Sequence, residues 1–434
     1  MSCVAHSDNG LRFDCTVVVA NPSSSVSVHF AEVSGPDRGT FESEASSVRD
    51  HDFVLWGMRP DRDHEVTVTV EGSVVATTGF RSGVLPDAFE QLSTVTTGSD
   101  PIIENLMVPL RCGGVPYMSI IDSEGSPLWY QQMGDENVGL FNLTPDGIIV
   151  LESRAIQEWS LEGELLRVLS QGEHFEHRVH HDAFVYEGLI YVLFAAAYPA
   201  GGQEVVLDGL YVFDESGAQV GQWELADHLD ITPADLVGLP PRQFWAEEFP
   251  GAVDYSHANS VFVDESGIYV STRWLSTVWK LGSFGTPEFG EVQWRLVGEA
   301  GMAVQQDFVL ESDVSEVVTF KGQHHATIAS DGTLTLFDNR RQPSTSSRVL
   351  AYDIDEGEQI AALVEVYELG ELCDIQGTTV KTADGDWIAV CSNSGVVSHF
   401  RAGAVEPSFT LQTGCDAPPP DGMAYPRALP VSLP

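Results

Sequence analysis

Basic residues are scarce in this chain. Its 434 residues include 21 lysines and arginines against 64 aspartates and glutamates, which gives a formal net charge of −43. A surface of this charge repels nucleic acid and anionic lipid, so we exclude both as primary partners. An anionic substrate would therefore need a local cationic pocket to overcome the overall field.

Long apolar runs and several common local motifs are also missing. The longest apolar run, Leu189–Tyr198, is about half of the ~20 residues that span a bilayer, so we expect no membrane-spanning segment. The chain contains no serine nucleophile elbow, no P-loop and no dinucleotide fingerprint. Hydrophobic content of 43% nevertheless excludes a disordered chain.

The six cysteines show no Cys-x-x-Cys spacing, which argues against a zinc ribbon or a thioredoxin-type motif. An even number of cysteines without metal spacing is typical of disulfides in an exported protein. We expect the pairs Cys3–Cys15, Cys373–Cys391 and Cys112–Cys415. The chain is then secreted or periplasmic, or displayed at the cell surface, although no signal peptide is recognisable at its start. The alternative is six reduced core thiols in a cytosolic protein.

Strand patterns dominate, and they predict an all-β protein. Short alternating strands with Pro and Gly turns over 11–82 predict an immunoglobulin- or fibronectin-like β-sandwich, residues 1–85, followed by a linker, 86–100. From residue 101 to 434 a repeat of about 40–50 residues predicts a six-bladed β-propeller. Two polar insertions, Asp227–Val253 and Glu299–Phe320, are expected to form rim loops, with one helical turn near Pro233–Val237.

One sequence motif, the histidine phrase, occurs three times. It consists of a histidine, a short alternating run, a glycine turn and an apolar strand. It begins at His181, His257 and His324. Because a propeller repeats equivalent positions around one axis, we expect these histidines to converge, with Arg273 close to them. Arginine beside neutral imidazoles is suited to hold a tetrahedral oxyanion while an imidazole attacks or transfers a proton.

Three other interpretations remain open. Each histidine alone is explained by hydrogen bonds to the backbone between blades, and His174, His177 and His228 fall outside the pattern. Three imidazoles with an open position also suit a divalent metal in a hydrolase or lyase, which Asp182 and Asp338 favour and Arg273 opposes. A non-catalytic binding or surface propeller is the third.

Four motifs in order along the chain resemble a known family. They are His180-His181-Asp182, Asp254-Tyr255-Ser256-His257-Ala258-Asn259, Ser271-Thr272-Arg273, and Gln323-His324 with Phe337-Asp338-Asn339. As a set they are similar to the bacterial arylsulfate sulfotransferases, and the resemblance covers nearly the whole chain. It implies a small β-sandwich followed by a six-bladed propeller, a periplasmic or secreted location, no cofactor, and independence of the nucleotide sulfuryl donor PAPS.

The resemblance further implies ping-pong transfer of a sulfuryl group from a phenolic sulfate ester to a phenol. His324 then resembles the transiently sulfurylated histidine, while His181, His257 and Arg273 resemble the groups that hold the sulfuryl oxygens and assist proton transfer. Further residues expected to bind substrate are His180, Asn259, Tyr255, His325 and Asn339. Where His325 stands the family usually has aspartate, and where Tyr255 stands it commonly has tryptophan. The extra imidazole would either change the pKa of the nucleophile or complete a metal site. The oligomeric state stays open, with a homodimer as one alternative.

Overall fold

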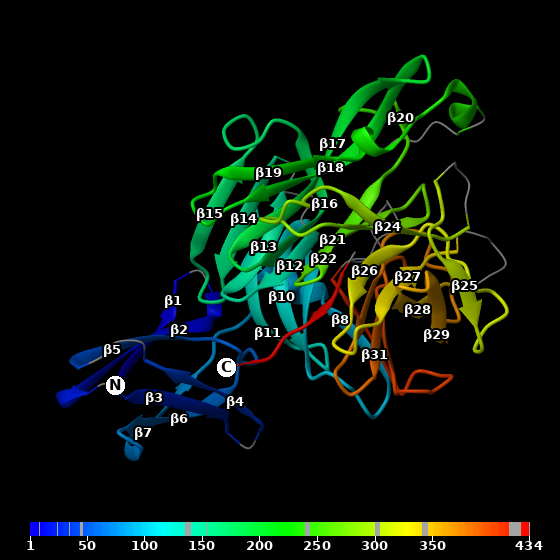
Figure 1. Ribbon diagram of the computed structural model, residues 1–434. Coiled ribbons are helices and arrows are strands. Elements are labelled where there is room, and N and C mark those ends of the chain that lie inside the picture. Colours follow the sequence, from blue (N-terminus) through cyan, green and yellow to red (C-terminus); the bar gives the residue numbers. More distant parts are fainter. Residues whose placement is uncertain are drawn as a thin grey trace.

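The computed structural model (Figure 1) describes residues 1–7, 9–23, 25–33, 35–43, 47–134, 140–152, 154–237, 239, 244–299, 304–340, 346–415 and 427–433. All regular elements in these ranges are β-strands except for three short 3-10 turns, η1 (Asp87–Gln91), η2 (Leu225–His228) and η3 (Pro233–Leu236). The all-β prediction is thus confirmed, and η3 is the helical turn expected near Pro233. No helix in these ranges is long and apolar enough to cross a membrane.

Two antiparallel sheets form the N-terminal part. One has the order β1-β2-β5, and the other has the order β4-β3-β6-β7. Alternate residues face a shared interior because side chains alternate across a strand. In β3, for example, Val26, Val28 and Phe30 are fully buried and belong to the same apolar cluster as Leu11 of β2. The strand bounds are β1 (Ser2–His6), β2 (Asn9–Ser23), β3 (Val26–Glu32), β4 (Asp37–Glu42), β5 (Val48–Leu55), β6 (Asp63–Val70) and β7 (Ser73–Arg81).

Six further sheets follow along the chain. The first contains β9 (Asn105–Cys112), β10 (Val115–Asp122), β11 (Pro127–Gln132) and β34 (Leu429–Pro430). The second contains β12 (Leu140–Thr144), β13 (Gly147–Glu152), β14 (Ala155–Ser160) and β15 (Leu165–Ser170). The third contains β16 (Arg178–Tyr186), β17 (Leu189–Ala200), β18 (Gln203–Phe213), β19 (Gln219–Glu224) and β20 (Val253–Asp254), which is parallel to β18.

The remaining three sheets have the same plan of antiparallel neighbours. The fourth contains β21 (Ala258–Asp264), β22 (Gly267–Thr272), β23 (Thr277–Leu281) and β24 (Val292–Val297). The fifth contains β26 (His324–Ile328), β27 (Leu334–Asp338), β28 (Arg348–Asp355), β29 (Ile360–Glu368) and β25 (Val309–Ser312), which is parallel to β29. The sixth contains β30 (Thr378–Lys381), β31 (Trp387–Cys391), β32 (Val396–Phe400), β33 (Phe409–Gly414) and β8 (Ser93–Gly98).

Both ends of the repeat region join sheets formed by distant parts of the chain. Strand β8 pairs with β33, so residues 93–98 of the predicted linker form a sheet strand rather than a connector. At the other end β34 pairs with β9 of the first sheet. The Cys112–Cys415 disulfide links β9 to the residue that follows β33. The Cys3–Cys15 and Cys373–Cys391 disulfides are also present, so all three predicted pairs are confirmed.

Successive sheets pack against one another through shared apolar clusters. Residues of β17 and β18 share a cluster with residues of β21 to β23, and residues of β22 to β24 share one with the fifth sheet. The first strands of these sheets also contact one another in order, β12 with β16, β16 with β21, β21 with β26, and β26 with β30. The three histidine phrases begin in or beside β16, β21 and β26, so this succession brings segments about 70 residues apart together.

Candidate active site

The first strand of each histidine-bearing sheet begins with an irregular backbone. The register of the pairing with the next strand changes at one point in each of these strands. The change lies between Val179 and Ala183 in β16, between Ala258 and Ser260 in β21, and between His324 and Thr327 in β26. The φ angles of His181, His257 and His325 are 57°, 55° and 49°, in the left-handed region. Such bulges redirect side chains out of the ladder. They also make His325, rather than His324, the backbone equivalent of His181 and His257, so the predicted internal alignment is wrong by one residue in this repeat.

His181 and His257 nevertheless lie side by side with their ring centroids 4.7 Å apart, and both are buried. On its other side, His181 Nδ1 lies 2.8 Å from Nδ1 of His180. Since only one of two facing nitrogens can hold the shared proton, the tautomers of these two rings are coupled. His180 Nε2 is 3.1 Å from Oδ1 of Asp208, a carboxylate that β18 supplies.

His257 is oriented by a carboxylate at the end of β20. Its Nδ1 lies 2.7 Å from Oδ2 of Asp254, and the same oxygen accepts a hydrogen bond from Trp274 Nε1 at 2.9 Å. A carboxylate accepts and does not donate, so Nδ1 of His257 carries the proton. This leaves Nε2 as the atom of His257 that exchanges a proton with a bound molecule.

His324 is oriented by an amide. Its Nδ1 lies 2.7 Å from Oδ1 of Asn339, while Asn339 Nδ2 donates to the carbonyls of Cys373 at 2.7 Å and Gln376 at 2.8 Å. Two carbonyl acceptors fix the NH2 end of the amide on their side, so the oxygen faces the imidazole and Nδ1 must donate. The lone pair of His324 is then on Nε2.

The charge of Arg273 lies close to these rings. Arg273 Nη2 donates to the carbonyl of Asp374 at 2.7 Å, and its guanidinium stacks over Trp274 at 4.5 Å from the ring centre. Burial, and next the charge of Arg273, hold the pKa of His324 well below its usual value of 6.5. Burial, followed by His257 and His180, lowers the pKa of His181 in the same way. Both imidazoles are therefore neutral at physiological pH.

Aromatic side chains border the histidines. Phe244 is 57% exposed, and its ring centre lies 5.0 Å from that of His181 and 4.9 Å from that of His257. The next residue, Trp245, is buried in a small cluster with Ala195 and Val206 and contacts His180 at 5.0 Å. The buried Trp245 thus anchors the segment that carries the exposed ring of Phe244.

Asn259 and Gln323 connect the strands that carry the site. Asn259 Nδ2 donates to the carbonyl of Gln323 at 2.6 Å, and Gln323 Nε2 donates to Ser271 Oγ at 2.9 Å. Because Gln323 directly precedes His324, these bonds fix the start of β26 against β21 and β22. Asn259 therefore positions the backbone next to His324.

The comparisons with known proteins bear on this arrangement. The model of the arylsulfotransferase (ASST) family matches residues 93–409. This chain belongs to the arylsulfotransferase family. None of the curated proteins gives a significant match.

Several solved structures are similar to this chain at low sequence identity. The periplasmic gluconolactonase of Pseudomonas aeruginosa is 13% identical, with a TM-score of 0.40 over 95% of this chain and 100% of that one. A hypothetical selenium-binding protein of Sulfolobus tokodaii is 11% identical, with a TM-score of 0.39 over 81% and 95%. Virginiamycin B lyase of Staphylococcus aureus is 9% identical, with a TM-score of 0.37 over 73% and 89%.

Membership in the arylsulfotransferase family supports a transferase acting on small molecules. Of the residues expected at the site, the structure gathers His180, His181, His257, Arg273 and His324, with Asn259 and Asn339 hydrogen-bonded beside them. Three disulfides and this bacterial family fit an extracytoplasmic protein.

Two expected residues lie elsewhere. Tyr255 is buried in the apolar cluster between the third and fourth sheets, with Leu236 and Leu193. His257, two residues further along, has a left-handed φ of 55° and lies beside His181. His325 is buried, and burial and next the charge of Arg427 lower its pKa to about 3, while a hydrogen bond with the backbone of Thr379 opposes them.

The donor atoms of the three histidines do not form a compact metal site. Among the described residues, the one group of three potential ligands with all donor atoms within 4.8 Å is Glu371, Cys373 and Cys391, whose sulfurs form a disulfide. The two carboxylates that favoured a metal at the sequence level, Asp182 and Asp338, form ion pairs with arginines. Asp182 Oδ1 lies 2.7 Å from Arg427 Nη1, and Asp338 Oδ2 lies 2.8 Å from Arg348 Nε.

Sequence reasoning missed several members of the site. Asp254 stands three residues before His257, within a quoted motif, so its spacing offered a signal. Phe244 and Trp245 fall in the predicted rim loop, where two adjacent aromatic residues in a polar insertion were the available signal. Asp208 gave none, because the pairing of β18 alone brings it to His180.

Proposed function

We propose that this chain is a PAPS-independent aryl sulfotransferase that moves a sulfuryl group from a phenolic sulfate ester to a phenol through an N-sulfohistidine at His324. We further infer that residues 1–85 form a β-sandwich of immunoglobulin or fibronectin type. The six sheets that follow would be the blades of one propeller. The contacts between successive first strands support this arrangement, since a propeller brings the innermost strands together around its axis.

The observation that carries the proposal is the state of His324. A nucleophilic imidazole has to be neutral, with a lone pair at the attacking atom. The Asn339 oxygen on Nδ1 leaves that lone pair on Nε2, and burial together with Arg273 keeps the ring unprotonated. A surface of net charge −43 would otherwise repel an aryl sulfate, so the guanidinium of Arg273 supplies the local positive charge that an anionic substrate requires.

In the first half of the reaction, Nε2 of His324 attacks the sulfur of the donor. The nitrogen–sulfur bond forms with the Nε2 lone pair, and the sulfur–oxygen bond to the aryl group breaks with its electrons leaving on the phenolate. In this step His257 carries a proton on each nitrogen; it gives the Nε2 proton to the phenolate and keeps the Nδ1 proton, which Asp254 Oδ2 accepts. Asn339 accepts from Nδ1 throughout and so stabilises the positive ring of N-sulfohistidine.

In the second half, a phenol acceptor occupies the place of the first product. Nε2 of His257 removes its proton, and the phenol oxygen attacks the sulfur. The sulfur–nitrogen bond breaks and its electron pair returns to Nε2 of His324. The transferring sulfuryl group carries its negative charge beside Arg273, and His181 offers a neutral imidazole at the neighbouring position.

Phe244 and Trp274 are the proposed contacts for the aryl rings. Both lie against His257, with ring centres 4.9 Å and 5.4 Å from its own. Phe244 is largely exposed, so one of its faces can stack on a phenolic ring. We further propose secretion or a periplasmic location, which the three disulfides support.

The test is turnover of a chromogenic aryl sulfate in the presence of a chelator, with and without a phenol acceptor. We expect release of the coloured phenol that depends on the acceptor and survives chelation. With donor alone, mass spectrometry should find one sulfuryl group on the peptide that contains His324. His324→Ala should abolish both signals, while His174→Ala, a histidine outside the site, should retain them.

Two of the other interpretations, the metal-dependent enzyme and the binding propeller, give different results in this experiment. Release that needs no acceptor and stops when the metal is chelated would overturn sulfuryl transfer in favour of a metal-dependent hydrolase. The absence of release and of the adduct, together with saturable binding of the aryl sulfate, would instead indicate a binding protein.

A further inference from the structure

One short loop supplies backbone acceptors to two different side chains of the site. Residues 373–376 lie between β29 and β30, outside the strands. The carbonyls of Cys373 and Gln376 accept from Asn339 Nδ2, and the carbonyl of Asp374 accepts from Arg273 Nη2, at distances of 2.7–2.8 Å. This loop therefore sets the direction of the amide that orients His324 and holds the guanidinium as well.

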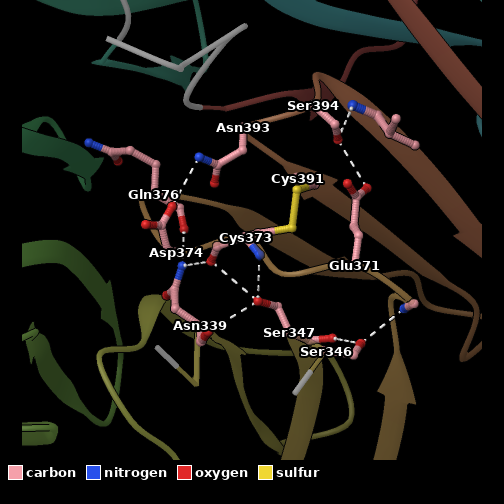
Figure 2. Close-up of a disulfide and its surroundings, with 12 residues drawn as sticks. Asn339, Ser346, Ser347, Glu371, Cys373, Asp374, Gln376, Cys391, Asn393 and Ser394 are labelled. Carbon is pink, nitrogen blue, oxygen red and sulfur yellow. Dashed lines mark hydrogen bonds between the residues drawn. A yellow bond between two sulfur atoms is a disulfide. The ribbon is translucent and has the colours of Figure 1, made fainter. Parts of the chain in front are cut away.

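Figure 2 shows how this loop is held. The Cys373–Cys391 disulfide joins it to β31, a strand whose residues are all buried. The Cys373 amide donates to Ser347 Oγ at 2.8 Å. At the other side of the loop, Asn393 Nδ2 donates to Asp374 Oδ1 at 3.0 Å. The disulfide is thus the covalent part of the support, and hydrogen bonds to neighbouring segments supply the rest.

A loop of this kind has no ladder of hydrogen bonds to keep its carbonyls in place. Gln376 also has a φ of 54°, a left-handed conformation that costs a non-glycine residue free energy unless its surroundings impose it. If the loop relaxes by a fraction of an ångström, Asn339 can rotate its amide and present NH2 to His324. The imidazole would then have to accept at Nδ1 and carry its proton on Nε2, the atom that must attack.

We propose that the Cys373–Cys391 disulfide is a positioning element of the sulfuryl-transfer site, which keeps the carbonyls of residues 373–376 where they orient Asn339 and Arg273. This inference rests on the proposed function of His324. The other disulfides have other places in the fold. Cys3–Cys15, for example, joins the first two strands of the N-terminal sheet.

The test compares two variants that each lose one disulfide. Cys373→Ala/Cys391→Ala removes the support of the loop, and Cys3→Ala/Cys15→Ala is the matched control. We expect the first variant to lose about ten-fold or more in kcat with little change in KM, because the donor can still bind while the attacking nitrogen is protonated in part of the molecules. The control should keep the kcat of the unmodified protein.

A second readout follows the tautomer directly. In protein labelled with ¹⁵N at histidine, the imidazole shifts of His324 should report a single tautomer protonated at Nδ1, and a mixture of tautomers in Cys373→Ala/Cys391→Ala. This comparison needs no turnover, so it tests the positioning role even if the chain fails to transfer sulfuryl groups. Unchanged His324 shifts and unchanged kcat in the folded variant would overturn the proposal.

Ser347→Ala covers the case in which the double variant does not fold. It removes the hydroxyl that receives the Cys373 amide and leaves the disulfide intact. We expect a smaller shift toward the second tautomer and a smaller loss of kcat than in the double variant. If this variant keeps the single tautomer and the full rate when the double variant cannot be purified, the loop does not control His324 and the proposal fails.

Discussion

Replacing Asn339 by aspartate should convert the nucleophile into a cation. In the native site the amide oxygen accepts from His324 Nδ1 at 2.7 Å and brings no charge. A carboxylate at this place would attract the imidazolium form, and two opposite charges about 4 Å apart interact by about 4 kcal/mol at the effective dielectric constant found near protein sites. This corresponds to about a thousand-fold higher affinity of His324 for a proton.

The consequence is a change in the pH profile. Burial and Arg273 keep the pKa of native His324 well below 6.5, so the nucleophile is neutral across the physiological range and does not limit activity there. In Asn339→Asp the proton is held about a thousand-fold more tightly, so the neutral, reactive form is lost as the pH falls and is regained as the pH rises. We therefore expect kcat/KM to fall toward acidic pH, by up to about a thousand-fold relative to the native protein, and to recover toward alkaline pH.

The assay is kcat/KM for an aryl sulfate between about pH 5 and pH 9, with folding checked by circular dichroism. The variant also faces the carbonyls of Cys373 and Gln376 with oxygen instead of NH2, so some loss of thermal stability is expected. Asn21→Asp, an exposed position on β2, controls for one added negative charge. A folded Asn339→Asp protein with the native rate and the native pH profile would refute the assignment of His324 as a neutral nucleophile oriented by Asn339.

Three further predictions follow from the same geometry. Arg273→Lys should lower kcat/KM by about 10- to 100-fold, because one ammonium cannot both hold the Asp374 carbonyl and face the sulfuryl group, and equal kinetics would exclude this role. Phe244→Ala should raise KM for phenolic substrates several-fold with less effect on kcat, and a KM that does not change with the aromatic size of the substrate would contradict the stacking. His325→Gln should make the folded protein lose less stability in acid. Burial lowers the pKa of His325 in the folded chain to about 3. A histidine with such a lowered folded-state pKa contributes stability that is fully present above about pH 6.5 and is lost as the pH falls. Between about pH 7.5 and pH 4.5 this loss amounts to about 2–3 kcal/mol for the native residue, so urea unfolding should show a correspondingly smaller decrease in the variant, and an equal decrease in both proteins would contradict it.

The sequence by itself determined the elements and the reactive residue types. Alternation of apolar and polar residues predicts β-strands, because one face of each strand has to be buried, and strands dominate the described residues. The repeated histidine phrase grouped His181, His257 and His324, although the left-handed residue of the third repeat is His325. Cysteine spacing was enough to indicate disulfides, and all three expected pairs are present.

Only the tertiary structure decided which neighbours act on those histidines. The carboxylate partner of His180 is Asp208 of β18, and no local pattern encodes this contact. Asn339 stands in a motif that the sequence offered, but only the folded chain shows that its amide oxygen faces Nδ1 of His324. Tyr255 is buried in the apolar cluster between the third and fourth sheets, and burial and the charge of Arg427 lower the pKa of His325. The pairing of β8 with β33 likewise depends on the two ends of the repeat region meeting in space. Residue types follow from the sequence, whereas the protonation of each ring depends on burial and on distant charges, which exist only in the folded chain.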